Sequence, residues 1–233
     1  FDLTEDVANT QKVMALAEGA ETAFMPQCGL APGFVSIVAA DLAKRFDILK
    51  DVQMRVGALP KYPTNALKYN LTWSTDGLIN EYCNMAEAVV DGELKEVAAL
   101  GDVEAFSLDG VTYEAFNTSG GLGTLCHTLQ GKVQNLNYKT VRYPGHRDIV
   151  KTLLRDLRLG EPDKRALLKQ ILEAAIPVTT QDVALVFVTV TGEKKGVLTQ
   201  ESYAKKIYAE ELHGRALSAI QITTAAAACA AMD

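Results

Sequence analysis

Hydrophobic and polar positions along the chain predict two parts of different character. In the first part, residues 6–18 carry apolar side chains at helical spacing, and a short strand is predicted at residues 22–25. A Gly/Pro loop at residues 26–33 and a helix at residues 34–46 follow. A strand, a loop and a helix in this order are typical of the edge of a doubly wound α/β sheet.

The second part, from about residue 50, is dominated by strand patterns. Residues 52–56 alternate between apolar and polar side chains, which predicts a half-buried strand. Asp-Gly dipeptides at residues 91–92 and 109–110 each lie between two apolar segments, and this dipeptide is the strongest short hairpin signal. Further strands are predicted at residues 136–143 and 182–191, and a turn at residues 192–196 leads into a partner strand that runs through Tyr203. The two successive hairpins indicate an antiparallel sheet.

Helical patterns are interspersed with these strands. A helix is predicted at residues 123–129. A second helix, with a clearer apolar face, is predicted at residues 147–159 and ends at Gly160. Another helix is predicted between the prolines at positions 162 and 177. The last segment, residues 211–231, is rich in alanine and apolar nearly all round, so we expect a helix that is buried against another element.

Charge and composition exclude several classes of function. The 233 residues carry a formal net charge of −6, which argues against nucleic acid or an anionic membrane as the main partner. No segment is apolar for long enough to span a bilayer, so no membrane span is predicted, and no signal peptide is visible. The four cysteines and three histidines are scattered, so we expect no metal site and a reducing, cytoplasmic location. The chain starts at Phe1 without Met and stops within a predicted helix, so both ends look cut.

A Gly-rich turn at residues 118–124 is the first candidate for chemistry. It lies between a predicted strand and a predicted helix, where backbone N–H groups and the helix dipole suit a carboxylate or phosphate. The turn lacks the lysine of a Walker loop and does not match G-x-G-x-x-G. A plain capped turn therefore stays open as the other interpretation.

Arg142 and His146 mark a second junction between a strand and a helix. An arginine here can form forked hydrogen bonds with a substrate carboxylate. A histidine near a helix N-terminus tends to stay neutral, so it can accept or relay a proton. The alternative is a surface arginine and a capping histidine.

Trp73 and Cys28 carry weaker signals. A single tryptophan is more often a core residue than a ligand contact. Cys28 lies in a loop beside glycines without a basic neighbour in sequence, so an inert thiol is expected. The residues by themselves predict an α/β chain with an anion-binding pocket, and they do not identify a reaction.

Several motifs together resemble the saccharopine dehydrogenase family, which includes lysine 6-dehydrogenase. Residues 27–33 (QCGLAPG) are similar to the C-G-x-x-P-G loop of that family. Residues 57–60 (GALP) and 69–74 (YNLTWS) resemble its G-G-L-P and Y-x-x-x-W-S elements. Residues 137–146 (NYKTVRYPGH) are similar to its Y-K-T-x-R-Y-P-G-H segment, and residues 2–5 (DLTE) to its D-L-T-x strand end. The order and spacing of these motifs are specific to the family rather than to one substrate.

The resemblance implies a fold of two parts. One is a Rossmann-type domain that binds NAD or NADP, and the other is an α+β substrate domain with a mixed, largely antiparallel sheet. Residues 1–48 would be the edge of the dinucleotide-binding domain, residues 49–210 the substrate-binding and dimerisation domain, and residues 211–233 a helix that packs back on the nucleotide domain. The G-x-G-x-x-G fingerprint is absent from this chain, so the main cofactor-binding motif is expected upstream of Phe1.

Site residues follow from the resemblance position by position. At the nicotinamide end of the cofactor it places Cys28, Gly29, Ala31 and Gly33. Facing the substrate it places Trp73, Thr118, Ser119, Arg142 and His146. Arg142 would hold a carboxylate, and His146 would position groups or relay a proton. Lys139 is a second candidate for proton transfer, because a buried lysine can have a lowered pKa.

The implied activity is oxidation or reduction of a C–N bond in a lysine-like amino acid, of the saccharopine dehydrogenase or lysine 6-dehydrogenase type. The expected partners are a small amino-acid substrate and a second copy of the chain, with no nucleic acid and no membrane. This chain alone is expected to be inactive. The alternative is a non-catalytic binding or dimerisation module on the same scaffold.

Overall fold

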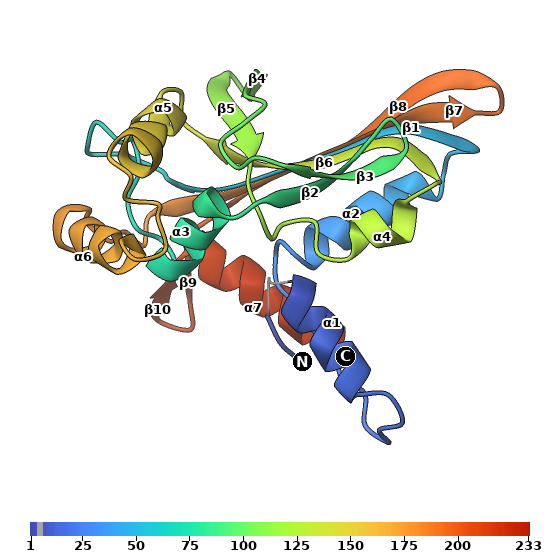
Figure 1. Cartoon of the computed structure of the whole chain (residues 1–233), viewed down its shortest axis with the longest axis horizontal. Helices are drawn as coiled ribbons and strands as arrows, with labels where there is room; N and C mark the ends of the chain where they lie inside the picture. Colours follow the sequence, from blue (N-terminus) through green and yellow to red (C-terminus); the bar gives the residue numbers. More distant parts are fainter. Residues whose placement is uncertain (4–6) are drawn as a thin grey trace.

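The computed structural model describes residues 1–3 and 7–233. The described residues form one eight-stranded sheet, with helices against one face and at one end, and a separate two-stranded hairpin (Figure 1). The strands of the sheet are β1 (Ile48–Pro60), β2 (Ala86–Val90), β3 (Glu93–Val97), β4 (Glu104–Leu108), β5 (Val111–Asn117), β6 (Val133–Arg142), β7 (Asp182–Lys194) and β8 (Val197–Tyr208).

The sheet combines one parallel pair of strands with several antiparallel pairs. Its order is β3-β2-β6-β1-β7-β8, and the β4–β5 hairpin joins through pairing of β5 with β6. Strands β1 and β6 run parallel, with Arg55 opposite Lys139 and Val56 opposite Thr140. The other pairs in this sheet are antiparallel. The mixed, largely antiparallel sheet is therefore confirmed, and so are both Asp-Gly hairpins.

Strand β7 lies between β1 and β8 and is apolar on both of its faces. Val186 and Val188 belong to the main core, which also includes residues of α2. Val183 and Leu185 belong to a smaller core on the opposite face. Because this strand is covered on both sides, its sequence is a nearly continuous apolar run instead of an alternating one.

The helices fall into two groups. Helices α2 (Phe34–Ala43), α4 (Leu125–Leu129) and α7 (Ala219–Met232) contact strands of the sheet on the face that lies below it in Figure 1. Helices α3 (Thr75–Cys83), α5 (His146–Lys151) and α6 (Arg165–Ala175) gather at one end of the sheet, around a core that includes Tyr69 and Phe116. Helix α1 (Val7–Leu16) lies near the N-terminus. None of the described helices is long and apolar enough to cross a membrane.

The segment at residues 210–217 corrects the prediction of one helix over residues 211–231. Strands β9 (Glu210–Leu212) and β10 (Arg215–Leu217) form a hairpin there. His213 and Gly214, at its turn, both have positive φ, so the chain reverses where a helix was expected.

Helix α7 begins only at Ala219, because strong capping interactions fix its first turn. Ser218 and Gln221 form a capping box, and the Asp182 carboxylate accepts the backbone N–H groups of Ala219 and Ile220. Within α7 only Ala219 is buried. Helix α7 thus packs against β7 and β8, as expected of a helix buried against another element, but most of its length stays half-buried or exposed.

Two further elements differ from prediction. Residues 22–25 form no regular strand, although Asp2 makes backbone hydrogen bonds with Met25 and Cys28. The helix predicted at residues 147–159 is α5 followed by a π-helical turn, Thr152–Asp156. The Thr152 hydroxyl donates to the Asp148 carbonyl, a contact that often bends helices. Residues 4 and 5 of the DLTE segment, compared above with a strand end, lie outside the described residues.

Candidate active site

A cavity of about 240 Å³ lies at the carboxyl ends of the parallel strands β1 and β6. Ligands of α/β sheets commonly bind at this position, because loops and helix ends converge there. The cavity is lined by Leu3, Gly29, Leu30, Ala31, Pro32, Val56, Ala58, Trp73, Glu81, Tyr138, Thr140, Arg142, Ile220 and Thr224. Most of this wall is apolar, and among these residues Glu81 and Arg142 carry the charges. The cavity thus brings together Gly29, Ala31, Trp73 and Arg142, four of the predicted site residues.

The loop at residues 28–33 forms one wall through its backbone. Gly33 has φ 133°, and a Cβ at this position would lie 2.2 Å from the Gly29 carbonyl oxygen, so only glycine fits. The same carbonyl accepts the Phe34 N–H at 2.9 Å, which starts helix α2. The buried Cys28 thiol donates to the Met25 carbonyl at 3.2 Å and does not line the cavity. Gly29 and Ala31 therefore reach the cavity, whereas Cys28 and Gly33 hold the loop in shape.

Arg142, the last residue of β6, is 1% exposed and its guanidinium is held on several sides. Its Nε donates to the Tyr82 hydroxyl at 2.7 Å, and its Nη1 donates to the Val141 carbonyl at 2.9 Å. The guanidinium carbon lies 5.0 Å from the centre of the Tyr69 ring. Its Nη2 lies 3.9 Å from Glu81 Oε2. This arrangement leaves Nη2 as the atom best placed to bind a carboxylate in the cavity.

His146 lies behind Arg142 and outside the cavity. Its Nδ1 is 2.8 Å from the Leu67 carbonyl, which can only accept, so the proton is on Nδ1. Its Nε2 therefore accepts from the Tyr82 hydroxyl at 3.0 Å. Burial, together with the charge of Arg142, lowers the pKa of His146 to about 3. The neutral histidine thus orients Tyr82, and Tyr82 in turn orients Arg142.

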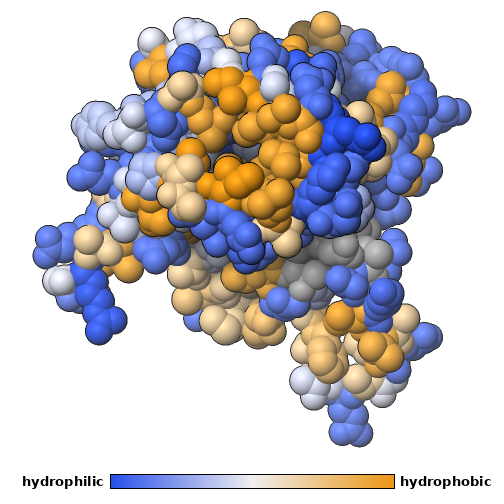
Figure 2. All heavy atoms as spheres, turned by 60° about the vertical axis from the view of Figure 1, so that its left-hand side comes forward, coloured by the Kyte–Doolittle hydropathy of each residue, from blue (hydrophilic) through white to orange (hydrophobic). Residues whose placement is uncertain are grey.

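On its other side, His146 borders an apolar hollow between α3, α5 and α6. Leu78, Leu154 and Leu168 are among the residues that line it. Figure 2 shows apolar side chains gathered around a depression at this end of the molecule. The apolar surroundings explain why the charged form of the imidazole is disfavoured.

Trp73 forms the side wall of the cavity next to α3. Its indole N–H donates to the Tyr69 hydroxyl at 3.2 Å. A Cβ on Gly77 would lie 2.3 Å from the indole ring, so the first turn of α3 can pack against Trp73 only because residue 77 is glycine. Trp73 thereby lies where it can contact a substrate in the cavity.

Thr118 and Ser119 lie next to the cavity and are not among the residues that line it. The Thr118 and Thr140 hydroxyls are 2.7 Å apart, and Ser119 binds the end of α3 through the carbonyls of Asn80 and Glu81. Both residues line a neighbouring hollow that shares Glu81 with the cavity. They hold the cavity wall in place instead of facing the substrate position directly.

Comparison with known proteins fits this arrangement. Residues 29–232 match the family model described as saccharopine dehydrogenase C-terminal domain. The chain belongs to this family. A solved structure of similar fold is the apo histidine-tagged saccharopine dehydrogenase (L-Glu forming) from Saccharomyces cerevisiae, with a TM-score of 0.70 and 16% sequence identity. The match covers 89% of this chain and 64% of that one, so the chain spans less than two thirds of its relative.

Membership in the saccharopine dehydrogenase family confirms the resemblance that the motifs indicated. The family is one of dehydrogenases, so this chain is part of an oxidoreductase family. The structure also adds residues that were not predicted as site residues, above all Tyr69, Glu81 and Tyr82. These residues are far from Arg142 in sequence, and no local pattern predicts that they meet it.

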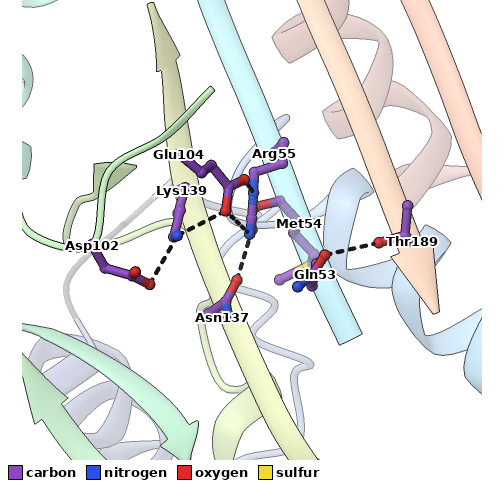
Figure 3. Close-up of polar contacts among 8 residues, drawn as sticks. All are labelled: Gln53, Met54, Arg55, Asp102, Glu104, Asn137, Lys139 and Thr189. Carbon is purple, nitrogen blue, oxygen red and sulfur yellow. Dashed lines mark hydrogen bonds and ion pairs between the residues drawn. The ribbon is translucent and has the colours of Figure 1, made fainter. Parts of the chain in front are cut away.

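Lys139 of this saccharopine dehydrogenase family chain lies on the opposite face of the sheet. Side chains alternate along a strand, so Thr140 and Arg142 face the cavity and Lys139 faces away. Its Nζ lies 2.8 Å from Asp102 and 2.8 Å from Glu104, and Glu104 also binds Arg55 (Figure 3). The lysine thus belongs to an ion-pair cluster, and its position does not support proton transfer in the cavity.

The first prediction concerns the charge state of His146. The pKa of His146 is about 3 in the folded protein, and the ordinary value for the unfolded chain is 6.5. The unfolded chain therefore binds the proton first as pH falls. The titration of His146 should therefore lower the free energy of unfolding by up to about 1.4 kcal/mol for each pH unit between pH 6.5 and about 3. Imidazole NMR should show neutral His146 at pH 5. In His146→Gln, which keeps a donor and an acceptor, this part of the pH dependence should disappear; titration of His146 near pH 6.5 would contradict the assignment.

The second prediction concerns the cluster around Glu104. Burial alone would raise its pKa, but the hydrogen bonds and charges of Arg55 and Lys139 outweigh burial and lower it. Glu104→Gln should lower the free energy of unfolding at pH 7 by roughly 1–3 kcal/mol, below the value for a fully buried pair because Glu104 is partly exposed. The difference should shrink as pH falls below 4.5, because the unfolded chain then takes up the proton before the native Glu104 carboxylate does. Urea unfolding at pH 7 and below pH 4.5 measures this difference in stability, and Glu96→Gln at an exposed position is the control. Equal stability of Glu104→Gln and wild type at pH 7 would argue against a stabilising role of the cluster.

Proposed function

We propose that this chain is the substrate-binding part of an NAD(P)-dependent oxidoreductase that acts on the C–N bond of a lysine-like amino acid. The observation that carries the proposal is the buried Arg142, whose guanidinium is oriented by Tyr82 toward an otherwise largely apolar cavity. Burying a cation is costly unless partners stabilise it, so such an arrangement favours a site for an anion. Arg142 would bind a substrate carboxylate.

The remaining walls suit the aliphatic part of such a substrate. Val56, Trp73 and Ile220 present apolar surface to the cavity. A lysine-like side chain has several methylene groups, which gain from leaving water. The cavity therefore has both the charged and the apolar surfaces that a long amino acid needs.

The loop at residues 28–33 fits the nicotinamide ring of the cofactor. Gly29, Ala31 and Pro32 present backbone and small side chains to the cavity, so a flat ring can lie against this wall. Bound NAD or NADP would supply the hydride acceptor or donor. His146 acts through Tyr82 and Arg142, so we propose it as a positioning residue.

The third prediction tests this function in the full-length protein. Nicotinamide absorbance is measured with L-lysine or saccharopine and with NAD⁺ or NADP⁺ in turn. Turnover of L-lysine supports the lysine 6-dehydrogenase type, and turnover of saccharopine supports the saccharopine dehydrogenase type. Arg142→Lys should raise KM on the order of tenfold or more, because lysine lacks the Nη2 donor and a hydrogen bond between charged groups contributes about 1.5–3 kcal/mol.

Arg155→Lys, at an exposed position outside the cavity, is the matched control and should leave KM unchanged. An unchanged KM in Arg142→Lys would remove the carboxylate-binding role. Cofactor binding without turnover of either compound would indicate another amine substrate. A full-length protein that binds no cofactor would favour the rival function, a non-catalytic binding or dimerisation module.

The fourth prediction concerns a homodimer, which we propose as the assembly. Strand β8 pairs only with β7 in the described sheet, and Val197 and Leu198 at its start are each 63% exposed. An open strand edge with apolar side chains favours pairing with a second copy. Sedimentation velocity should show a dimer that Leu198→Lys weakens and Lys205→Ala does not. A monomer at the highest attainable concentration would contradict the proposal.

A further inference from the structure

Glu81 is the second charged residue of the cavity wall. It lies in the last turn of α3, and its side chain is only 12% exposed. Its Oε2 lies 3.9 Å from Nη2 of Arg142, which is longer than a hydrogen bond. The two opposite charges therefore lie side by side at the cavity without being joined by a direct hydrogen bond between these atoms.

The positions of both charges are fixed by the surrounding structure. Ser119 donates its N–H to the Glu81 carbonyl at 3.1 Å and its hydroxyl to the Asn80 carbonyl at 3.1 Å, which anchors the end of α3. Arg142 is held by the Tyr82 hydroxyl. A ligand in the cavity thus meets a cation from β6 and an anion from α3 at a constant separation.

An α-amino acid carries the complementary pair of charges on a single carbon atom. We propose that Glu81 binds the α-ammonium group of the substrate while Arg142 binds its carboxylate, so that Glu81 makes the site specific for α-amino acids. This assignment rests on the proposed function. If Glu81 binds the α-ammonium group, then a carboxylic acid that lacks the α-amine binds through Arg142 and makes no use of Glu81.

The competing explanation is that Glu81 only neutralises the buried Arg142. In that case its loss affects every ligand that uses Arg142, with or without an α-amine. L-lysine and 6-aminohexanoate distinguish the two explanations, because they share the carboxylate, the chain and the terminal amine and differ only in the α-amine.

The experiment is calorimetric binding of both compounds to the full-length protein with reduced cofactor, which prevents oxidation of the amine. Glu81→Gln should weaken L-lysine binding at least tenfold and leave 6-aminohexanoate binding within about twofold, a small difference on the free-energy scale. Glu81→Asp should restore part of the loss. Glu87→Gln, in the neighbouring hollow, is the control and should bind both compounds as wild type does.

Each other outcome overturns a defined statement. Equal weakening of both compounds in Glu81→Gln assigns Glu81 to neutralising Arg142 and overturns the specificity role, while the proposed function stands. Unchanged L-lysine binding in Glu81→Gln overturns the role as well. A wild-type protein that binds neither L-lysine nor saccharopine overturns the proposed function, and the assignment of Glu81 with it. Retained 6-aminohexanoate binding in the variant shows that the protein is folded.

Discussion

Burial of the Arg142 guanidinium is the constraint on which the site depends. A cation that is 1% exposed persists only where hydrogen bonds and opposite charge replace its water. Tyr82 and the Val141 carbonyl provide hydrogen bonds, Tyr69 provides the face of its ring, and Glu81 provides negative charge nearby. Because Tyr82 and Glu81 both belong to α3, the position of this helix is tied to the position of the arginine.

The neutral histidine extends this network into the core. His146 donates to the Leu67 carbonyl and accepts from Tyr82, so the direction of every hydrogen bond from Leu67 to Arg142 is determined. A protonated His146 would place two positive charges on either side of one hydroxyl. The neutral imidazole lets the Tyr82 hydroxyl donate to Nε2 of His146 while it accepts from Nε of Arg142.

The pleat of β6 separates two charged systems that are adjacent in sequence. Thr140 and Arg142 face the cavity, whereas Lys139 faces the cluster with Glu104 and Arg55 on the opposite side. The parallel pairing of β1 with β6 puts Arg55 opposite Lys139, so their two positive charges require the Glu104 carboxylate. The strand thus provides a cavity-facing arginine and an ion-paired lysine within four residues.

The sequence by itself determined the class of the fold, both Asp-Gly hairpins and the family, because these depend on local patterns and on motifs of fixed spacing. It also predicted part of the candidate site. Gly29, Ala31, Trp73 and Arg142 were predicted from such motifs and line one cavity. Only the tertiary structure decided that Lys139 faces away and that Glu81 approaches Arg142, because these facts depend on strand pairing and on helix packing. It also decided that residues 210–217 form a hairpin, since Asp182 caps α7 at Ala219 from a distant strand. Contacts between residues far apart in sequence leave no local pattern, and for that reason the chain's composition and periodicity did not reveal them.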